Sequence, residues 1–363
     1  MKFCRLTSRL VVLFAVSAAA QERLHPKPAW EINLSHFDAQ KPGRYFGVNL
    51  PDVLRSVAFG KRTTLIVFGG KTRLPEPVNG NLVWQPTPIY GLLLDSDTGK
   101  VKQKRTWNCC IFPNFKAFAT VGGNFIVFLE DGKTFNSALT LYGPTLEPIR
   151  QEVFRPLHEH EEWHPIMAPS GRTFLLTHTE DSQRPLYDFH VMDPDTWVER
   201  QSWRGNEWVY KISDDTMVGH RLERFGLPSE AIDQSPTRHF TNGLFFRGGK
   251  DRIEVTNLKN AVVFECQLSA KDEQLSTHID NVSADGKRIV VRITARYSGH
   301  NWLHKAFVPQ RYFVYVYEIP RKEPIFQLAI GPPTHPFETF LSQDGSMLAV
   351  AIGIKVMAYR LPQ

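Results

Sequence analysis

The stretch Leu341-Ser342-Gln343-Asp344-Gly345-Ser346-Met347-Leu348-Ala349-Val350 contains the structural unit from which the chain is built. A polar turn with an Asp-Gly pair leads into an apolar strand, and a second strand with alternating side chains follows at Lys355 to Leu361. Asp and Gly accept the backbone conformations that a tight hairpin requires. The stretch therefore predicts two antiparallel strands joined by a short turn.

Imperfect copies of this hairpin recur along the chain, and no long stretch has the 3.6-residue periodicity of a helix. The copies are Ser56 to Phe68, Ala117 to Phe128, Pro165 to Leu176, Val209 to Val218 and Ile279 to Val291. Short apolar or alternating runs between Gly, Pro, Asp and Asn indicate an all-β protein. Self-similarity on this scale is typical of propellers and other repeat arrays.

Each of these earlier copies is followed by a later hairpin and an outer strand, which gives four strands in a unit. The outer strands are Val101 to Trp107, Ile149 to Phe154, Trp197 to Trp203, Val262 to Leu268 and Ile325 to Ile330. In the fourth unit, the hairpin Val209 to Val218 would join strands at Ile253 to Val255 and Val262 to Leu268. We therefore predict a single β-propeller over residues 21–363, with six four-stranded blades.

Seven blades are the alternative, because the interval between the turns at Asp215 and Asp285 leaves room for further strands within Phe225 to Gly249. The last unit lacks a fourth strand, and the N-terminal run Ala29-Trp30-Glu31-Ile32-Asn33-Leu34 has the length to supply it. Such a strand would close the ring and leave no open edge between the first and last blades.

The first 20 residues have the features of a signal peptide. Lys2, Arg5 and Arg9 precede the apolar run Leu10 to Val16, and Ala18-Ala19-Ala20 offers a cleavage site. The apolar run is too short to span a bilayer comfortably, which disfavours a membrane anchor. We expect an exported protein, periplasmic or secreted, with no membrane span after cleavage.

Cleavage would lower the formal net charge from +6 to +3, which gives little reason to expect nucleic-acid binding. It would also remove Cys4 and leave Cys109, Cys110 and Cys266. A bond between the two neighbouring cysteines, a bridge from one of them to Cys266, and buried thiols are all open. We expect a monomer.

Two of the turns carry a resemblance to a known family. Ser283-Ala284-Asp285-Gly286-Lys287 and the stretch from Ser342 to Val350 resemble the S-x-D-G-x-x-L-A-V blade signature of bacterial secreted WD40-like, or YVTN and lactonase-like, propellers. The resemblance covers most of the chain as a weak repeat, and it implies a scaffold rather than an activity.

The densest group of chemically active residues is His158-Glu159-His160-Glu161-Glu162-Trp163-His164, between the second and third units. His158 and His160 would share one side of an extended segment, and imidazole with carboxylate is a common ligand set for divalent metals. We name His158, His160, Glu162 and His164 as candidate metal ligands, with a solvated polar loop as the alternative. His164, His278 and His335 precede the first turns of their units at similar spacing, which favours a structural role at blade junctions.

Two functions remain from the sequence. Long connections such as Gly69 to Pro88 and Leu222 to Gly249 would lie on one face, and long loops on a rigid scaffold are where binding usually occurs. We therefore predict a binding or interaction scaffold for a protein, peptide or glycan. The alternative is a metal-dependent, lactonase-like hydrolase that uses the His and Glu cluster.

Overall fold

The computed structural model describes residues 26–39, 44–45, 48–49, 55–71, 76–78, 81–83, 85–110, 114–156, 161–179, 186–206, 209, 211–214, 216–218, 222–224, 239–257, 259, 261–269, 273–298, 310–319, 321, 323–331 and 337–363. The predicted signal peptide lies outside these residues. Strands dominate, and a 3₁₀ turn, η1 (Leu34–Phe37), is the one helical element among the described residues. No helix within these ranges is long and apolar enough to cross a membrane.

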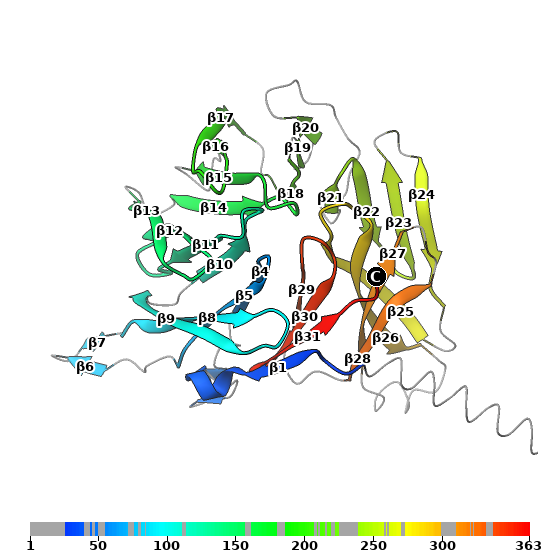
Figure 1. Ribbon diagram of the computed structural model, residues 1–363, viewed down its shortest axis with the longest axis horizontal. Helices are drawn as coiled ribbons and strands as arrows, with labels where there is room; N and C mark the ends of the chain where they lie inside the picture. The colour runs from blue at the N-terminus through cyan, green and yellow to red at the C-terminus, as the bar shows by residue number, and fades with distance from the viewer. Residues whose placement is uncertain are drawn as a thin grey trace, which may run out of the picture.

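Six four-stranded antiparallel sheets stand as the blades of a propeller, which confirms the predicted fold (Figure 1). The first three, from the innermost strand outward, are β4 (Arg55–Phe59), β5 (Thr63–Gly69), β8 (Thr87–Asp95) and β9 (Val101–Cys110); β10 (Asn114–Ala119), β11 (Phe125–Glu130), β12 (Ser137–Tyr142) and β13 (Pro148–Phe154); and β14 (Glu162–Met167), β15 (Phe174–Thr179), β16 (Tyr187–Met192) and β17 (Glu199–Gly205). The other three are β21 (His239–Thr241), β22 (Leu244–Gly248), β23 (Arg252–Asn257) and β24 (Val262–Gln267); β25 (Glu273–Val282), β26 (Arg288–Tyr297), β27 (Arg311–Glu318) and β28 (Pro324–Gly331); and β29 (Phe337–Leu341), β30 (Met347–Ile352), β31 (Lys355–Arg360) and β1 (Trp30–Asn33).

A shorter sheet lies between the blades β14–β17 and β21–β24. It has three described strands, β18 (Lys211–Ile212), β19 (Thr216–Val218) and β20 (Leu222–Arg224), and β18 contacts the innermost strands on both sides. The predicted fourth unit is therefore wrong, because β18 and β19 do not share a sheet with β23 and β24. The inner partners of β23 are instead β21 and β22, within the interval Phe225 to Gly249 where the sequence left room for further strands.

The hairpin β21–β22 has a local cause. Asn242 and Gly243 form its turn with φ values of 50° and 71°, and positive φ at both central residues is the requirement of a two-residue hairpin turn. Asn-Gly meets that requirement at low cost, because both residues tolerate the left-handed region. This dipeptide was the sequence signal for the additional strands.

The ring closes as predicted, because β1 pairs with β31 in antiparallel register, from Trp30 opposite Ala358 to Asn33 opposite Lys355. The Trp30 side chain is buried, and its Nε1 donates to the backbone oxygen of Ser96 at 2.8 Å, in the neighbouring blade. The closing strand is thus held by a sheet ladder on one side and by packing on the next blade.

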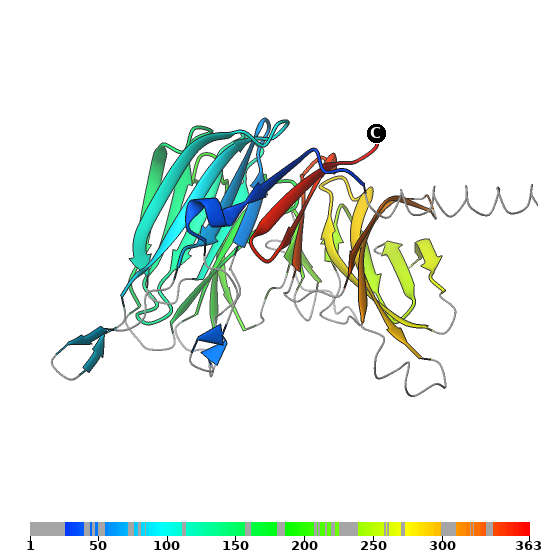
Figure 2. The same ribbon diagram turned by 90° about the horizontal axis from the view of Figure 1, so that it is seen from below.

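The two faces of the ring differ. We call the face with the hairpin turns between the first and second, and between the third and fourth, strands of each blade the tight-turn face. The opposite loop-rich face carries the remaining connections. Two of these contain further hairpins, β2 (Arg44–Tyr45) with β3 (Val48–Asn49) and β6 (Glu76–Val78) with β7 (Asn81–Val83), which project from the same side of the blades in Figure 2.

The core lies between the blades. Successive side chains of a strand point to opposite faces of its sheet, so each strand serves two interfaces. In β11, Phe125 packs with Leu65 of the preceding blade, while Ile126 packs with Phe174 of the following blade. The second strand of this blade, β11, is apolar at nearly every position because both of its faces pack against other blades.

The cysteines resolve one of the open alternatives. Cys110 is disulfide-bonded. Cys266 keeps its thiol and is buried on β24. The bridge to Cys266 is therefore wrong. Burial raises the pKa of the neighbouring Tyr317, and a hydrogen bond with Cys266 adds to this shift. The side chain of Cys109 lies outside what the structure describes.

Candidate functional site

Four ionisable side chains lie near the loop-rich ends of the inner strands of the second and third blades. They are Lys116 on β10, Glu130 at the end of β11, and Glu162 and His164 on β14, and we call them the Lys116 cluster. Glu162 and His164 are two residues apart in a strand and share one side, so His164 Nε2 lies 3.0 Å from Glu162 Oε2.

Glu130, Glu162 and His164 are half-buried, whereas Lys116 is exposed. Burial raises the pKa of Glu130, and the nearby charge of Glu162 also acts to raise it. Burial likewise lowers the pKa of His164, although Glu162 opposes this shift. Such shifts in neighbouring residues are typical of functional sites as well as of structural networks.

A buried hydroxyl without a partner lies beside the cluster. Thr177 is 2% exposed, and its Oγ1 makes no hydrogen bond. Thr177 is the register partner of His164 across β14 and β15, so both side chains project from the same face of the sheet. Trp163 Nε1 is also buried without a partner. Buried polar atoms are nearly always hydrogen-bonded, and each exception calls for an explanation.

The face of β14 that packs against the second blade carries an aromatic stack. The Trp163 ring lies between the rings of Phe154 and His178, with centroid distances of 4.2 Å on each side. His178 Nε2 lies 2.9 Å from Glu161 Oε1. The stack therefore fixes both the indole and the imidazole next to the loop-rich face.

A polar row continues from this stack to the outer edge of the blade. His178 Nδ1 lies 3.7 Å from Asp188 on the next strand. Arg204 on the outermost strand donates two hydrogen bonds to Asp188, at 2.7 and 2.9 Å. The hydrogen bond from Arg204 holds the pKa of Asp188 below its ordinary value. The charge of Asp188 is thereby neutralised within the blade.

The structure describes two of the four predicted metal ligands and brings those two together. Glu162 and His164 are in contact, whereas His158 and His160 lie outside the described residues. No three His, Cys, Asp or Glu side chains gather as a metal-binding group in the described part of the chain. A divalent-metal site on these four residues stays a prediction.

Sequence reasoning missed Lys116 and Glu130. The available signal was the alternation in Asn114-Phe115-Lys116-Ala117-Phe118, which puts a lysine on the polar side of an innermost strand. The proximity of Lys116 to His164 depends on how two blades pack, and no local pattern states it.

The histidine expected at a blade junction is found there in one described case. His278 Nδ1 lies 2.9 Å from Asp280 Oδ1, and Asp280 accepts a hydrogen bond of 2.9 Å from Thr339 in the next blade. Arg292 also donates to Asp280, at 2.6 and 3.2 Å. His335 lies outside the described residues.

Asp280 gives a prediction on pH. Burial acts to raise its pKa, but the hydrogen bonds and charges of His278, Arg292 and Thr339 outweigh burial and lower it below 3.8. A lowered pKa in the folded state means that the stabilisation is fully present above the unfolded pKa and is lost as the pH falls through the folded pKa. We expect Asp280→Asn to reduce the free energy of unfolding by about 1–3 kcal/mol at pH 7.

This loss should shrink below about pH 4, because the wild type then loses the same charge. Urea unfolding at pH 7, 5 and 3.5 measures it. The control is Asp97→Asn, which removes an exposed ion pair with Arg360 and should cost less than about 1 kcal/mol. A difference between wild type and Asp280→Asn that stayed constant at all three pH values would contradict the prediction.

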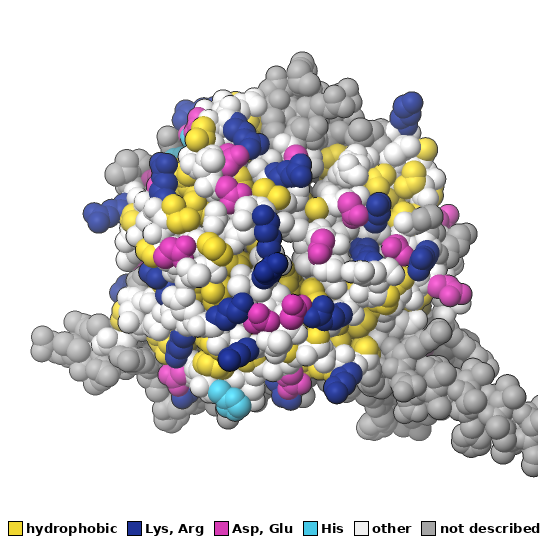
Figure 3. Space-filling view, in the orientation of Figure 1, with side chains coloured by type: hydrophobic (Ala, Val, Ile, Leu, Met, Phe, Trp, Pro, Cys, Tyr) yellow, Lys and Arg dark blue, Asp and Glu magenta, His cyan; other side chains and the backbone are white. Residues whose placement is uncertain are grey.

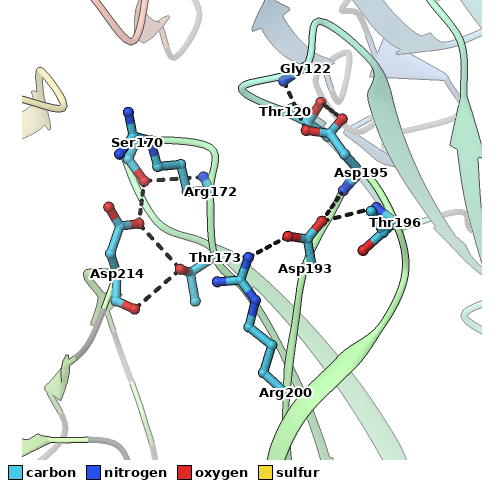
Figure 4. Close-up of polar contacts among 10 residues, drawn as sticks. All are labelled: Thr120, Gly122, Ser170, Arg172, Thr173, Asp193, Asp195, Thr196, Arg200 and Asp214. Carbon is cyan, nitrogen blue, oxygen red and sulfur yellow. Dashed lines mark hydrogen bonds and ion pairs between the residues drawn. The ribbon is translucent and has the colours of Figure 1, made fainter.

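The tight-turn face is also rich in carboxylates, but these are used to join blades (Figure 4). Asp195, between β16 and β17, reaches the first turn of the preceding blade. It accepts hydrogen bonds from the backbone nitrogen of Gly122 at 2.8 Å, from Asn124 Nδ2 at 2.9 Å, and from the Thr120 hydroxyl. One side chain thus ties two blades together.

Two further aspartates at this face also have partners, Asp214 in the preceding blade and Asp193 within its own. Asp214, in the turn of the three-stranded sheet, accepts hydrogen bonds from Ser170 and Thr173 of the preceding blade, and Asp193 pairs with Arg200. A cavity of about 350 Å³ lies among these residues. Figure 3 shows basic and acidic side chains interspersed on the face that it presents, with no large patch of one sign.

Comparisons with known proteins add similarity in fold alone. No protein-family profile matches the chain, and no curated protein matches it. Among solved structures, the WD40 domain of SCAP from fission yeast is 10% identical, covering 93% of this chain and 98% of that one with a TM-score of 0.39. The β-propeller domain of the Trilobed protease from Pyrococcus furiosus is 10% identical, covering 83% and 79% with a TM-score of 0.34. The Dos1 propeller is 12% identical, covering 87% and 68% with a TM-score of 0.29. At these values the comparisons assign neither a family nor a ligand, and the strand pairing of the chain itself identifies it as a β-propeller.

Proposed function

We propose that the chain is a binding scaffold that holds a protein or peptide partner at its loop-rich face, over the Lys116 cluster. The observation that carries this proposal is the contrast between the two faces. At the tight-turn face, Asp195 and Asp214 accept hydrogen bonds from the adjacent blade. At the loop-rich face, Thr177 Oγ1 and Trp163 Nε1 are buried without a hydrogen-bond partner.

A binding role accounts for that contrast. Leaving a buried polar atom without a hydrogen-bond partner costs free energy. Among the described residues, no ion pair reaches Lys116, and Thr177 Oγ1 has no hydrogen-bond partner. A bound partner could supply the missing contacts, and a rigid ring of sheets would keep these groups in place for it. The metal-dependent hydrolase has no observation in its favour among the described residues.

The expected export directs the search for the partner to the periplasmic or secreted fraction. The test blocks one face at a time without altering its charges. Asn114→Cys places a thiol at an exposed position beside the Lys116 cluster, where Asn114 contacts Glu130. Lys61→Cys places one in an exposed turn at the tight-turn face. Each variant is labelled with a maleimide of about 2 kDa, which is large compared with one side chain. Cys266 is buried and Cys110 is disulfide-bonded, which limits their labelling.

We expect the protein captured by unlabelled chain to be lost, by at least about tenfold, when Asn114→Cys is labelled. Capture should persist when Lys61→Cys is labelled. Loss at Lys61→Cys with retention at Asn114→Cys would contradict the assignment of the face. A fraction that yields no partner for any form of the chain would count against the scaffold itself.

A further inference from the structure

A cavity of about 550 Å³ lies at the outer rim of the ring, between the last two blades. One wall is the beginning of the outer strand β28, and another is Pro26 with Lys27, just before the closing strand β1. Figure 1 shows β1 beside β28 at this place. Tyr359 and Arg360, at the end of β31, complete the lining. We call this space the seam cavity, and it is separate from the Lys116 cluster, which belongs to the second and third blades.

The sequence explains why the seam is open here. Trp30 pairs with Ala358 at the start of β1, and Ala29 N donates to Ala358 O at 2.7 Å. The preceding residue is Pro28, which has no N–H group to continue the ladder. Because β31 runs on to Arg360, its last residues extend beyond the pairing with β1 and border the seam cavity instead.

Much of the cavity wall is apolar. Ile325 and Phe326 of β28 line it, as does Tyr359 of the last blade. The rings of Phe326 and Tyr359 contact each other across the two blades, with their centroids 5.2 Å apart. Both residues are buried, so this wall is fixed by packing. Binding sites for small organic ligands typically combine such apolar walls with a few polar groups.

The charged part of the lining is mainly basic. Lys27, Arg321 and Arg360 line the seam cavity, and Glu323 is the acidic residue among its lining residues. Lys27 forms no ion pair within the part of the chain that the structure describes. A basic lining around a partly apolar space favours an anionic ligand.

The two arginines have partners but can donate further hydrogen bonds. Arg321 Nε lies 3.1 Å from Glu318, and Arg360 pairs with Asp97, and neither carboxylate lines the cavity. The arginine side chains are 67% and 60% exposed, and ion pairs at such positions contribute only about 0–1 kcal/mol. A guanidinium group has five N–H donors, so each arginine can also bind an incoming carboxylate.

We infer that the seam cavity binds a small organic acid, a carboxylate attached to an apolar body. The carboxylate accepts hydrogen bonds from Lys27 and from the guanidinium groups, and the apolar body lies against Ile325 and the ring of Tyr359. Glu323 repels the ligand and limits its affinity. This inference goes beyond the proposed function and does not depend on it.

The test uses phenylbutyrate as the probe, titrated into the full chain and followed by isothermal calorimetry. Phenylbutanol and phenylbutylamine carry the same apolar body with a neutral and a positive end. We expect phenylbutyrate to bind with a Kd of about 1 mM or below, and the other two at least about tenfold more weakly. Added salt should weaken the binding of phenylbutyrate, because it screens exposed charges.

Substitutions of opposite charge should act in opposite directions. Lys27→Gln should weaken the binding of phenylbutyrate about fivefold, and Glu323→Gln should tighten it about threefold. Lys355→Gln is the matched control, because Lys355 is a lysine of the last blade that pairs with Glu31 and does not line the cavity. It should leave the affinity unchanged. Thermal unfolding of each variant separates loss of binding from loss of fold.

Equal affinities for phenylbutyrate and phenylbutanol would overturn the inference, as would equal losses from Lys27→Gln and Lys355→Gln. Absence of binding at about 10 mM phenylbutyrate would do the same. Labelling at Asn114→Cys blocks a different pair of blades and should leave the binding of phenylbutyrate intact. Failure of the seam cavity to bind the acid therefore leaves the proposed function standing, and failure to capture a partner leaves the seam cavity standing.

Discussion

Trp30→Ala is expected to lower the free energy of unfolding by about 3–5 kcal/mol, the range for truncating a buried aromatic side chain. Trp30 is 6% exposed and belongs to the apolar cluster between the first and last blades. Its indole packs against Gly99, where an added Cβ would lie 2.6 Å from the Trp30 side chain. Truncation removes these contacts together with the hydrogen bond to Ser96.

Urea denaturation followed by fluorescence measures this loss, because the unfolding free energy depends linearly on denaturant concentration. Glu31→Gln is the control on the same strand. Glu31 points to solvent and pairs with Lys355 at 2.9 Å in an exposed ion pair, so its substitution should cost less than about 1 kcal/mol. Equal effects of Trp30→Ala and Glu31→Gln would show that closure by β1 contributes little to stability.

Gly171→Ala is expected to cost about 2–4 kcal/mol, from backbone strain and a steric clash together. Gly171 has a φ of +68°, which an L side chain rarely adopts. An added Cβ would also lie 2.8 Å from the backbone oxygen of Ala119 and would collide with the side-chain amide of Gln343. Gln343 Nε2 donates to that same oxygen of Ala119 at 2.7 Å.

Two comparisons separate strain from clash. Gly123 has a φ of +93°, but the nearest atoms to an added Cβ belong to the flexible Lys61 at 3.6 Å. Gly123→Ala should therefore show the strain alone, about 1–2 kcal/mol. In the double variant Gly171→Ala with Gln343→Ala, the loss should be at least about 1 kcal/mol smaller than the sum of the single losses. Equal losses for Gly171→Ala and Gly123→Ala would rule out the contact between these turns.

The fold was predictable where each local feature repeats. The turns around Gly171, Asp285 and Asp344 each separate two apolar strands, and that spacing alone indicates a ring of antiparallel sheets. Prediction failed at Asn242-Gly243, where strands of only three and five residues, β21 and β22, have too few side chains to show alternation. The fourth unit was consequently assembled from strands that lie in two different sheets.

The candidate site was predictable only in part. Glu162 and His164 are two residues apart, so a strand brings them together without any help from the rest of the chain. Lys116 and Glu130 reach them from the preceding blade, and that approach depends on packing between sheets. Thr177 lies beside His164 because the two residues are register partners in the antiparallel strands β14 and β15. The sequence shows that an innermost strand carries a charged residue. It does not show which residues of the next blade lie near that charge.

Pairing of β1 with β31 has a consequence for how the molecule assembles. Trp30 and Ala358 lie at opposite ends of the chain and become neighbours in one sheet, so the earliest strand of the ring has no partner until the latest one has been synthesised. Contacts of such long separation in sequence are made late and slowly. A chain that stops short of β31 leaves both β1 and β30 with unpaired backbone groups, and such edges favour pairing with another chain. Only a chain that includes β31 can pair both β1 and β30 and so leave no open edge at this blade.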